Sequence, residues 1–293
     1  MGRRGEGIEV LERLNKLPKT IAGPEMDLEN LKVIKKFVCN AEREILFDKQ
    51  SFMSDSQKMK DDESITVEIN TISEAGRQHR VDSIVRETEA RLKVNGRFCT
   101  QLFCLPYHFE ELAIGYLTTG GLDPAYIANI EVKEVDPAIY EILVTLEKEI
   151  YRNLSTVNSQ LRIKKEDVFA YANELEEGGI LFKATGGTHV VAAFSRGSDT
   201  ILIEDVSRHC AIDKLVGACI TKGIAISESV LITSCRQTYT TVKKEICAGF
   251  PITISVSAPT ALAVKEADEF GMTLVGFARD KRFNVYTNDW RIV

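Results

Sequence analysis

Apolar runs typical of strands alternate with helix patterns along residues 201–287. Helix patterns separate the first four of five strand runs, which lie at 201–203, 230–233, 252–256, 272–277 and 283–287. Gly249 and Gly271 follow two of these helix patterns, and glycine commonly ends a helix. An alternation of this kind favours an α/β layered fold with parallel strands.

The residues upstream predict a second, β-rich region. Asn95-Gly96 supplies the positive φ angles that a tight turn between two strands requires. A helix pattern through Leu112 and Leu117 ends at Gly120-Gly121. Further patterns predict strands at 65–70, 127–135 and 140–146, an exposed polar loop at 152–165 and a helix at 165–179.

We therefore expect three regions along the chain. Residues 1–64 form an N-terminal extension that is partly helical or disordered. Residues 65–165 form a β-rich subdomain with one helix and a polar loop, and residues 166–293 form an α/β domain that carries the binding site.

Composition argues against several classes of function. The formal net charge is −6 and the isoelectric point about 5.5, so we expect no nucleic acid as a partner. No apolar run has the length of a membrane span, and the first ten residues lack the apolar core of a signal peptide. Seven cysteines occur without a CxxC pair, which suits a reducing compartment. These features predict a cytoplasmic protein without a membrane partner.

Polar clusters follow the core strands where each strand ends. The clusters are Glu204, Asp205, Arg208 and His209; Ser234, Cys235 and Arg236; Ser257 to Thr260; and Ala278 to Arg282. In open α/β sheets, ligands bind beyond the carboxyl ends of the strands, so we expect the clusters to meet in one crevice. Upstream, Gly186 and Gly187 permit close approach of a ligand to the backbone beside His189.

The clusters favour an anionic ligand. Two of them open helices with hydroxyl residues, and the free N–H groups of a helix N-terminus attract anions. Arginine suits phosphate because its planar guanidinium binds two oxygens at once. The cations that would contribute are Arg208, Arg236, Arg279, Lys281 and Arg282. We predict a phosphorylated or nucleotide-like ligand.

Simpler structural roles remain open for several of these residues. Asp205 and Asp213 can cap the following helix and pair with Arg208, and Asp213 and Lys214 have the pattern of a helix surface. Cys210 and Cys235 are the only cysteines inside polar clusters, although inert packing explains them better than reactivity. The segment RHCAID lacks the H-x-E and P-C-x-x-C pattern of deaminase sites, so we expect no zinc.

A set of longer motifs resembles one known family. The motifs are ARLKVNGR, LPYHFEELAIGYLTTGGL, ATGGTH, EDVSRHCAIDKLVG, SAPTALAV and LVGFARDKRFNVYT. Across residues 85–287 they resemble, in this order, the FdhD/NarQ family of formate dehydrogenase accessory proteins.

The resemblance implies a fold, a client and a site. The fold would be a cytidine-deaminase-like mixed sheet layered with helices, without zinc, beside a smaller N-terminal β-rich part. The protein would be a cytoplasmic homodimer that carries sulfur from a cysteine desulfurase to the molybdenum bis(molybdopterin guanine dinucleotide) cofactor of formate dehydrogenase. The family's cofactor segment matches Phe277, Ala278, Arg279, Asp280, Lys281 and Arg282.

One segment departs from the family pattern. Family members that carry sulfur have a CGxCG loop, which should fall between the strand at 140–146 and the helix at 165–179. Residues 153–160, NLSTVNSQ, fill that place and include no cysteine. A serine hydroxyl cannot carry a transferable sulfane sulfur, so the family's sulfurtransferase activity does not follow from the resemblance.

Three hypotheses stay open at this point. The chain is an accessory protein that binds the cofactor and passes sulfur to it, with Cys210 or Cys235 as weak candidates for the thiol. Alternatively, it is a non-catalytic chaperone for the cofactor or a guanine nucleotide. A nucleotide hydrolase or deaminase is suggested only by the fold, which does not determine function.

Overall fold

The computed structural model describes residues 63–195 and 200–293. The described residues belong to one compact unit. The predicted N-terminal extension therefore lies almost entirely outside the described residues, and the predicted boundary at residue 165 stays a prediction. Within the described residues, every helix is too short or too polar to cross a membrane.

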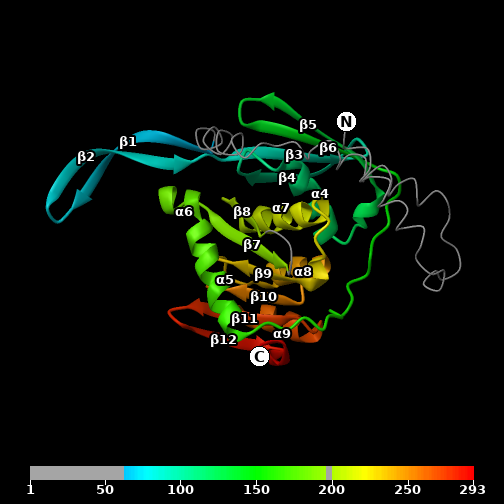
Figure 1. Cartoon of the computed structure of the whole chain (residues 1–293). Coiled ribbons are helices and arrows are strands. Elements are labelled where there is room, and N and C mark those ends of the chain that lie inside the picture. Colours follow the sequence, from blue (N-terminus) through cyan, green and yellow to red (C-terminus); the bar gives the residue numbers. More distant parts are fainter. Residues whose placement is uncertain (1–62, 196–199) are drawn as a thin grey trace, which may run out of the picture. The chain divides into compact units, whose positions relative to one another are not determined.

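A six-stranded sheet forms the centre of this unit (Figure 1). The strand order is β12-β11-β10-β9-β7-β8. Strands β9, β10 and β11 are parallel, whereas β7 and β12 run antiparallel to their neighbours. The strands are β7 (His189–Ser195), β8 (Ile201–Asp205), β9 (Ser229–Thr233), β10 (Ile252–Ser255), β11 (Thr273–Arg279) and β12 (Arg282–Thr287).

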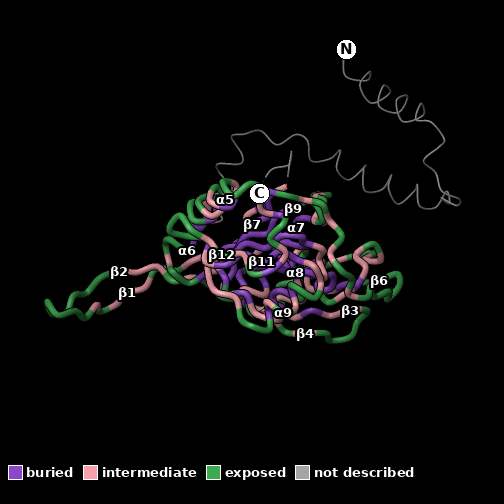
Figure 2. Tube along the Cα trace, turned by 90° about the horizontal axis from the view of Figure 1, so that it is seen from below, coloured by how far each residue is buried: buried purple, intermediate pink, exposed green. Residues whose placement is uncertain are grey.

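Helices cover both faces of this sheet. The side chains of Val190, Ile232 and Val275 pack toward α5, while those of Val191, Leu231 and Leu274 pack toward the opposite face. Figure 2 shows the resulting buried interior of the sheet between exposed helix surfaces. The helices are α5 (Lys165–Gly178) and the short α6 (Ile180–Thr185) on one side, with α7 (Arg208–Thr221), α8 (Tyr239–Ala248) and α9 (Ala261–Glu269) on the other.

A second sheet and one helix lie beyond α7. The second sheet has the order β4-β3-β6-β5, and its inner face packs on α4 (Phe109–Thr119). Its strands are β3 (Thr88–Val94), β4 (Arg97–Cys104), β5 (Ile127–Asp136) and β6 (Ile139–Leu146). A two-stranded antiparallel ribbon of β1 (Ser64–Ser73) and β2 (Gly76–Val85) extends from this region (Figure 1). The 3₁₀ turns η2, η3 and η4 span Pro124–Tyr126, Ile226–Glu228 and Asp289–Arg291.

Helices α4 and α7 pack so closely that only glycine fits at two positions. A Cβ at Gly115 would lie 1.7 Å from the carbonyl oxygen of Asp213, and one at Gly217 would lie 1.9 Å from that of Glu111. The missing side chains let the two backbones touch. Helix α7 is therefore covered by the sheet on one side and by α4 on the other, and most of its residues are buried.

Two buried ion pairs hold α7 in this position. Lys214 and Asp205 are fully buried with their Nζ and Oδ2 atoms 2.7 Å apart. The Lys214 ammonium also donates to the carbonyl oxygen of Leu105 and lies 4.6 Å from the centre of the Tyr107 ring. Asp213 accepts from Lys244 at 2.6 Å and from the hydroxyl of Thr119 at 2.7 Å.

The prediction that Asp213 and Lys214 lie on a helix surface is therefore wrong. The predicted pairing of Asp205 and Asp213 with Arg208 is also wrong, because their partners are Lys214 and Lys244. Asp213 is 1% exposed and Lys214 is not exposed at all. The sequence pattern assumed that α7 has one buried face, whereas α4 covers the opposite face as well.

The predicted alternation is confirmed for residues 201–287, as is the hairpin at Asn95-Gly96, where both residues have positive φ angles. Strand β7 was not predicted, nor were β2 and α6. The segment 152–164 lacks regular structure, as expected, but it is not simply exposed. Ile163 is buried, and Leu154 and Val157 pack against α8 and α9 residues.

Replacing Lys214 by Met should lower the free energy of unfolding by about 3–5 kcal/mol, because Asp205 is left buried without its counter-ion. Lys222→Met, at an exposed position next to the same helix, should change it by less than about 0.5 kcal/mol. Urea unfolding followed by circular dichroism measures both. In the double variant Asp205→Asn with Lys214→Met, the free energy of unfolding should fall by less than the sum of the two single changes. An additive fall would show that the two residues are not coupled.

Candidate functional site

The carboxyl ends of β8, β9, β10 and β11 lie at one edge of the six-stranded sheet. Strands β9, β10 and β11 are mutually parallel, and β8 points the same way because it is antiparallel to β7, which is antiparallel to β9. The first residues of β7 and β12, His189 and Arg282, start at this same edge. The structure thus brings the predicted polar clusters to one edge, while their binding role stays a prediction.

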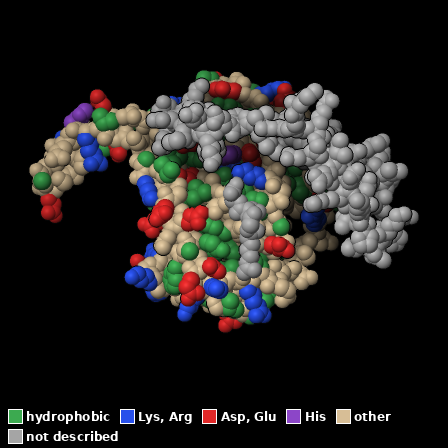
Figure 3. Space-filling model, viewed as in Figure 1, with side chains coloured by type: hydrophobic (Ala, Val, Ile, Leu, Met, Phe, Trp, Pro, Cys, Tyr) green, Lys and Arg blue, Asp and Glu red, His purple; other side chains and the backbone are tan. Residues whose placement is uncertain are grey.

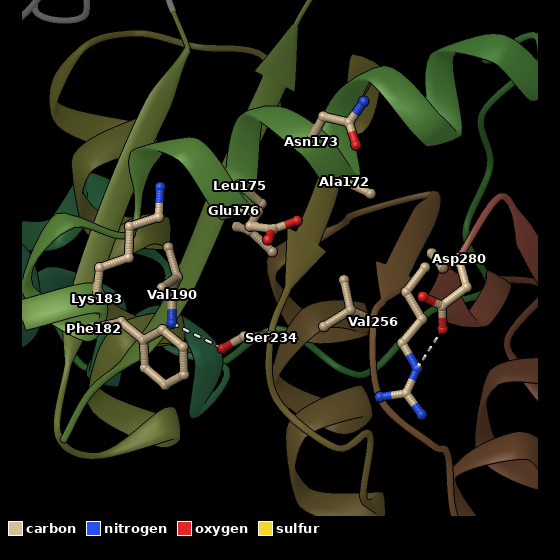
Figure 4. A pocket seen from close by; sticks show the side chains of 13 residues that line it. Ala172, Asn173, Leu175, Glu176, Phe182, Lys183, Val190, Ser234, Val256 and Asp280 are labelled. Atoms are coloured by element: carbon tan, nitrogen blue, oxygen red, sulfur yellow. Dashed lines mark hydrogen bonds and ion pairs between the residues drawn. The ribbon is translucent and has the colours of Figure 1, made fainter. Parts of the chain in front are cut away.

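A pocket of about 430 Å³ lies at this edge on the α5 side (Figure 4). Its volume is in the range of small-molecule sites. Four of the predicted residues line it, namely Ser234, Ala278, Arg279 and Asp280. The sequence interpretation missed its α5 and α6 wall, which includes Asn173, Glu176, Phe182 and Lys183.

The end of β11 and the turn into β12 contain three residues in the left-handed region of backbone conformation. Phe277, Asp280 and Lys281 have φ angles of 55°, 54° and 57°, which non-glycine residues rarely adopt. The N–H of Phe277 donates to the carbonyl oxygen of Ser257, which ties this turn to the end of β10. Arg279 lies 3.7 Å from the Asp280 carboxylate and 5.9 Å from the centre of the Phe277 ring. Positive φ angles at Asp280 and Lys281 are what a two-residue hairpin turn between Arg279 and Arg282 requires, whereas Phe277 lies in the register shift between Gly276 and Arg279.

A group of basic side chains lies around the same edge, near the start of α7. The pKa of His189 is lowered by burial and by the positive charges of Arg208 and Arg236, against an opposite effect of Asp205. The pKa of His209 is lowered by burial and by the charges of Lys244, Arg208 and His189. Arg208 acts on both histidines, His189 acts on His209, and Arg236 acts on His189, and we call these four residues the basic cluster.

Two polar atoms of the basic cluster are buried without a partner. Among the described residues, neither Arg208 Nε nor His209 Nδ1 has a hydrogen bond. A buried donor without a partner costs free energy, so it commonly indicates a missing water, ion or ligand. The charges of Arg208 and Lys244 act on His209, and those of Arg208 and Arg236 act on His189, which favours an anion as the missing partner of Arg208 Nε. The lowered pKa of His209 favours its neutral ring, so its Nδ1 can donate or accept a hydrogen bond.

His209 also lines a second hollow, of about 420 Å³, with Cys210, Ser207 and Lys244. This hollow lies between α4, α7, α8 and β4, whereas the first pocket is lined by α5, α6 and strand ends. Four predicted residues therefore line the first pocket, His209 and Cys210 line the second, and the other predicted residues line neither of these two hollows. Figure 3 shows acidic and basic side chains intermixed on the viewed face.

Glu204 and Asp205 face the interior of the protein. The Glu204 carboxylate accepts hydrogen bonds from the N–H groups of Leu181 and Phe182 and from the hydroxyl of Thr188, at 2.7–2.8 Å. It therefore holds the first turn of α6 against the sheet. Asp205 is engaged with Lys214. Both carboxylates are occupied within the protein, so they can position the site more readily than they can contact a ligand.

The exposed Gly186 and Gly187 connect α6 to β7. Gly186 ends α6 with a φ angle of 66°. A Cβ at Gly187 would lie 2.6 Å from the side chain of Val85, so the absence of a side chain admits β2 rather than a ligand at this point.

Comparison with known proteins identifies the family. A sequence model of the FdhD/NarQ family matches residues 144–293. The sulfur carrier protein FdhD of Methanothermobacter thermautotrophicus is 31% identical over 229 residues, with 72% of this chain and 92% of that protein covered. The chain belongs to the FdhD/NarQ family.

Other members agree with this assignment. The sulfur carrier protein FdhD of Bacillus subtilis is 31% identical over 237 residues, with 72% of this chain and 90% of that protein covered. A crystal structure from Desulfotalea psychrophila, named as a formate dehydrogenase accessory protein, has a TM-score of 0.71 and 27% identity. It covers 79% of this chain and 100% of that chain, so the mixed α/β fold is that of the FdhD/NarQ family.

The two cysteines considered from the sequence are poorly placed for sulfur chemistry in this FdhD/NarQ protein. Cys210 is 2% exposed and Cys235 is 1% exposed. Burial raises the pKa of Cys210 to about 12 and that of Cys235 to about 11. Because the thiolate is the reactive form, both thiols are inert near neutral pH. Among the described cysteines, Cys99 is exposed and Cys247 is half-buried.

A fully buried glutamine fastens two of the loops at the edge. The backbone N–H of Gln237 donates to the backbone carbonyl oxygen of Ala258. The backbone carbonyl oxygen of Gln237 accepts from the backbone N–H of Thr260. The loops after β9 and β10, which carry Ser234 and Ser257, are thereby joined. Glu245 on α8 lies next to the Gln237 amide, and its carboxyl group is fully buried without a well-formed hydrogen bond.

Burial raises the pKa of Glu245 from 4.5 to about 8, so the folded protein keeps this carboxyl group protonated at neutral pH. Since the unfolded chain releases this proton near pH 4.5, the free energy of unfolding should fall as the pH rises from about 4.5 to about 8. Glu245→Gln should flatten this part of the profile, measured by urea unfolding at a series of pH values. Glu269→Gln, at an exposed position on α9, is the control; an unchanged slope in Glu245→Gln would contradict the assignment.

Proposed function

We propose that this FdhD/NarQ protein is an accessory factor for formate dehydrogenase that holds the molybdenum bis(molybdopterin guanine dinucleotide) cofactor as cargo. The relatives are named as sulfur carriers and as a formate dehydrogenase accessory protein. The partners in this proposal are formate dehydrogenase and a cysteine desulfurase. A homodimer, a cytoplasmic location and the likeness to cytidine deaminases are further predictions of the same resemblance.

The observation that carries the proposal is the pair of unpartnered atoms, Arg208 Nε and His209 Nδ1, at the edge where the strand ends meet. A pyrophosphate offers several acceptor oxygens and a negative charge, so it matches the guanidinium of Arg208, and a neutral His209 ring can donate to it from Nδ1. Arg236, Arg279 and Arg282 are exposed at the same edge and can bind further phosphate oxygens. The pocket of about 430 Å³ at this edge offers an apolar wall to the guanine base of the cofactor.

In this proposal the residues at the edge have different tasks. The basic cluster and the segment 277–282 hold the phosphates. Glu204 acts as a positioning residue because its carboxylate holds the start of α6, and the backbone of Gln237 joins two of the edge loops. The buried pair of Asp205 and Lys214 holds the start of α7, and with it Arg208.

Sulfur transfer is a second candidate function, favoured by the names of the relatives. The sulfane sulfur would move from the persulfide of the desulfurase to a thiolate of this chain, and the desulfurase cysteine would leave as a thiolate. The accessible thiols are better suited to this step than the buried ones. Cys99 is exposed and Cys247 half-buried, while Cys39 lies outside the described residues.

The cofactor proposal predicts that the double variant Arg279→Ala with Arg282→Ala binds GDP at least about tenfold more weakly than the unchanged protein. Each guanidinium that binds phosphate supplies a charge-assisted hydrogen bond, typically about 1.5–3 kcal/mol. Isothermal titration calorimetry with GDP measures the change.

The control is Arg77→Ala with Arg97→Ala, which removes the same charge from exposed positions on β2 and β4. An equal loss in both double variants would indicate a general effect of charge. Unchanged GDP affinity in Arg279→Ala with Arg282→Ala would refute the assigned site.

For sulfur transfer, we expect that Cys210→Ser and Cys235→Ser leave persulfide formation unchanged, because both thiols are buried and protonated near neutral pH. The protein is incubated with a cysteine desulfurase and cysteine, and mass spectrometry locates any added sulfur. Persulfide that disappears in either variant would show that a buried thiol is the carrier. If the unchanged chain takes up no sulfur at all, cofactor holding remains as the function.

A further inference from the structure

The α5 side of the pocket contains a carboxylate that the proposed function does not use. Glu176 lines the pocket from α5, together with Ala172 and Leu175. Figure 4 shows its carboxylate extending from the helix into the space between α5 and the strand ends. In the described part of the chain, this carboxylate takes part in no hydrogen bond or ion pair.

The other acidic groups near this edge are already engaged. Glu204 accepts three hydrogen bonds, and Asp280 pairs with Arg279. Asp205 is bound to Lys214. Glu176 is therefore the pocket carboxylate with both oxygens available to a ligand, and a carboxylate can only accept hydrogen bonds.

The remaining walls of the pocket suit a flat ring. Apolar side chains come from both sides, and the ring of Phe182, which is 47% exposed, lies at the end formed by α6. Aromatic side chains stack on nucleobases, at about 1–3 kcal/mol per base. Arg279 and Lys183 also line the pocket, so they can approach phosphates attached to the ring.

We propose that Glu176 selects the base of the bound nucleotide and gives the site its preference for guanine over adenine. Guanine has two adjacent donors, N1–H and the 2-amino group, that match the two oxygens of one carboxylate. Adenine has an acceptor at N1, which the carboxylate repels. A site built around a hydrogen-bonding group discriminates strongly against a base that lacks its partner. This inference rests on the proposed nucleotide-binding function of the pocket.

The test compares the full chain with its Glu176→Gln variant in titrations with GDP, IDP, ADP and pyrophosphate. Glu176→Gln should weaken GDP binding by about 10- to 100-fold, the range for a lost hydrogen bond to a charged group. Affinities for ADP and pyrophosphate should change by less than about threefold. IDP, which lacks the 2-amino group, should bind the unchanged chain more weakly than GDP does, and this difference should disappear in the variant.

The matched control is Glu174→Gln, because Glu174 and Glu176 are both exposed carboxylates on α5 and only Glu176 lines the pocket. It should keep the unchanged chain's preference for GDP. A Glu176→Gln variant that still prefers GDP over ADP to the same degree would overturn the role of Glu176 while leaving the nucleotide site intact. If neither GDP nor pyrophosphate binds the unchanged chain, the proposed function fails and this inference fails with it.

Discussion

The directions of the strands in the six-stranded sheet determine which polar loops of this protein come together. Because β8, β9, β10 and β11 all point the same way, four loops with polar side chains leave the sheet at one edge. The antiparallel β7 adds His189 to that edge by starting there. Side chains that are far apart in the sequence thus lie at the same edge of the sheet. The pocket beside α5 and the basic cluster are both consequences of this arrangement.

Buried charges then hold the edge in place. Lys214 has no exposed surface, and its ammonium connects the end of β8 with the backbone of Leu105 beyond β4. Such a pair adds little net stability compared with apolar packing, but it becomes costly when one partner is removed. The geometry of α7 therefore depends on these pairs being complete. Since Arg208 and His209 are the first residues of that helix, the basic cluster depends on them too.

The sequence predicts the core of this arrangement because it depends on local patterns. The helices and strands of residues 201–287 have clear periodicity, and the turn at Asn95-Gly96 has a specific backbone requirement. Strand β7 has only a short apolar run, which periodicity does not distinguish from other buried segments. The burial of Lys214 and the place of Glu176 in the pocket depend on which elements pack together. Which elements pack together is a property of the tertiary structure, and the local sequence pattern around Lys214 or Glu176 does not reveal it.

Hydrogen–deuterium exchange of the full chain, with and without GDP, tests most directly whether the carboxyl edge is the binding site. We expect slower exchange of backbone amides at 182–190, 206–210, 234–238 and 277–282, because these segments come from different elements but surround one edge. Little change should occur in the ribbon at 64–85. Protection that misses these four segments, or that is confined to the second sheet, would contradict the account.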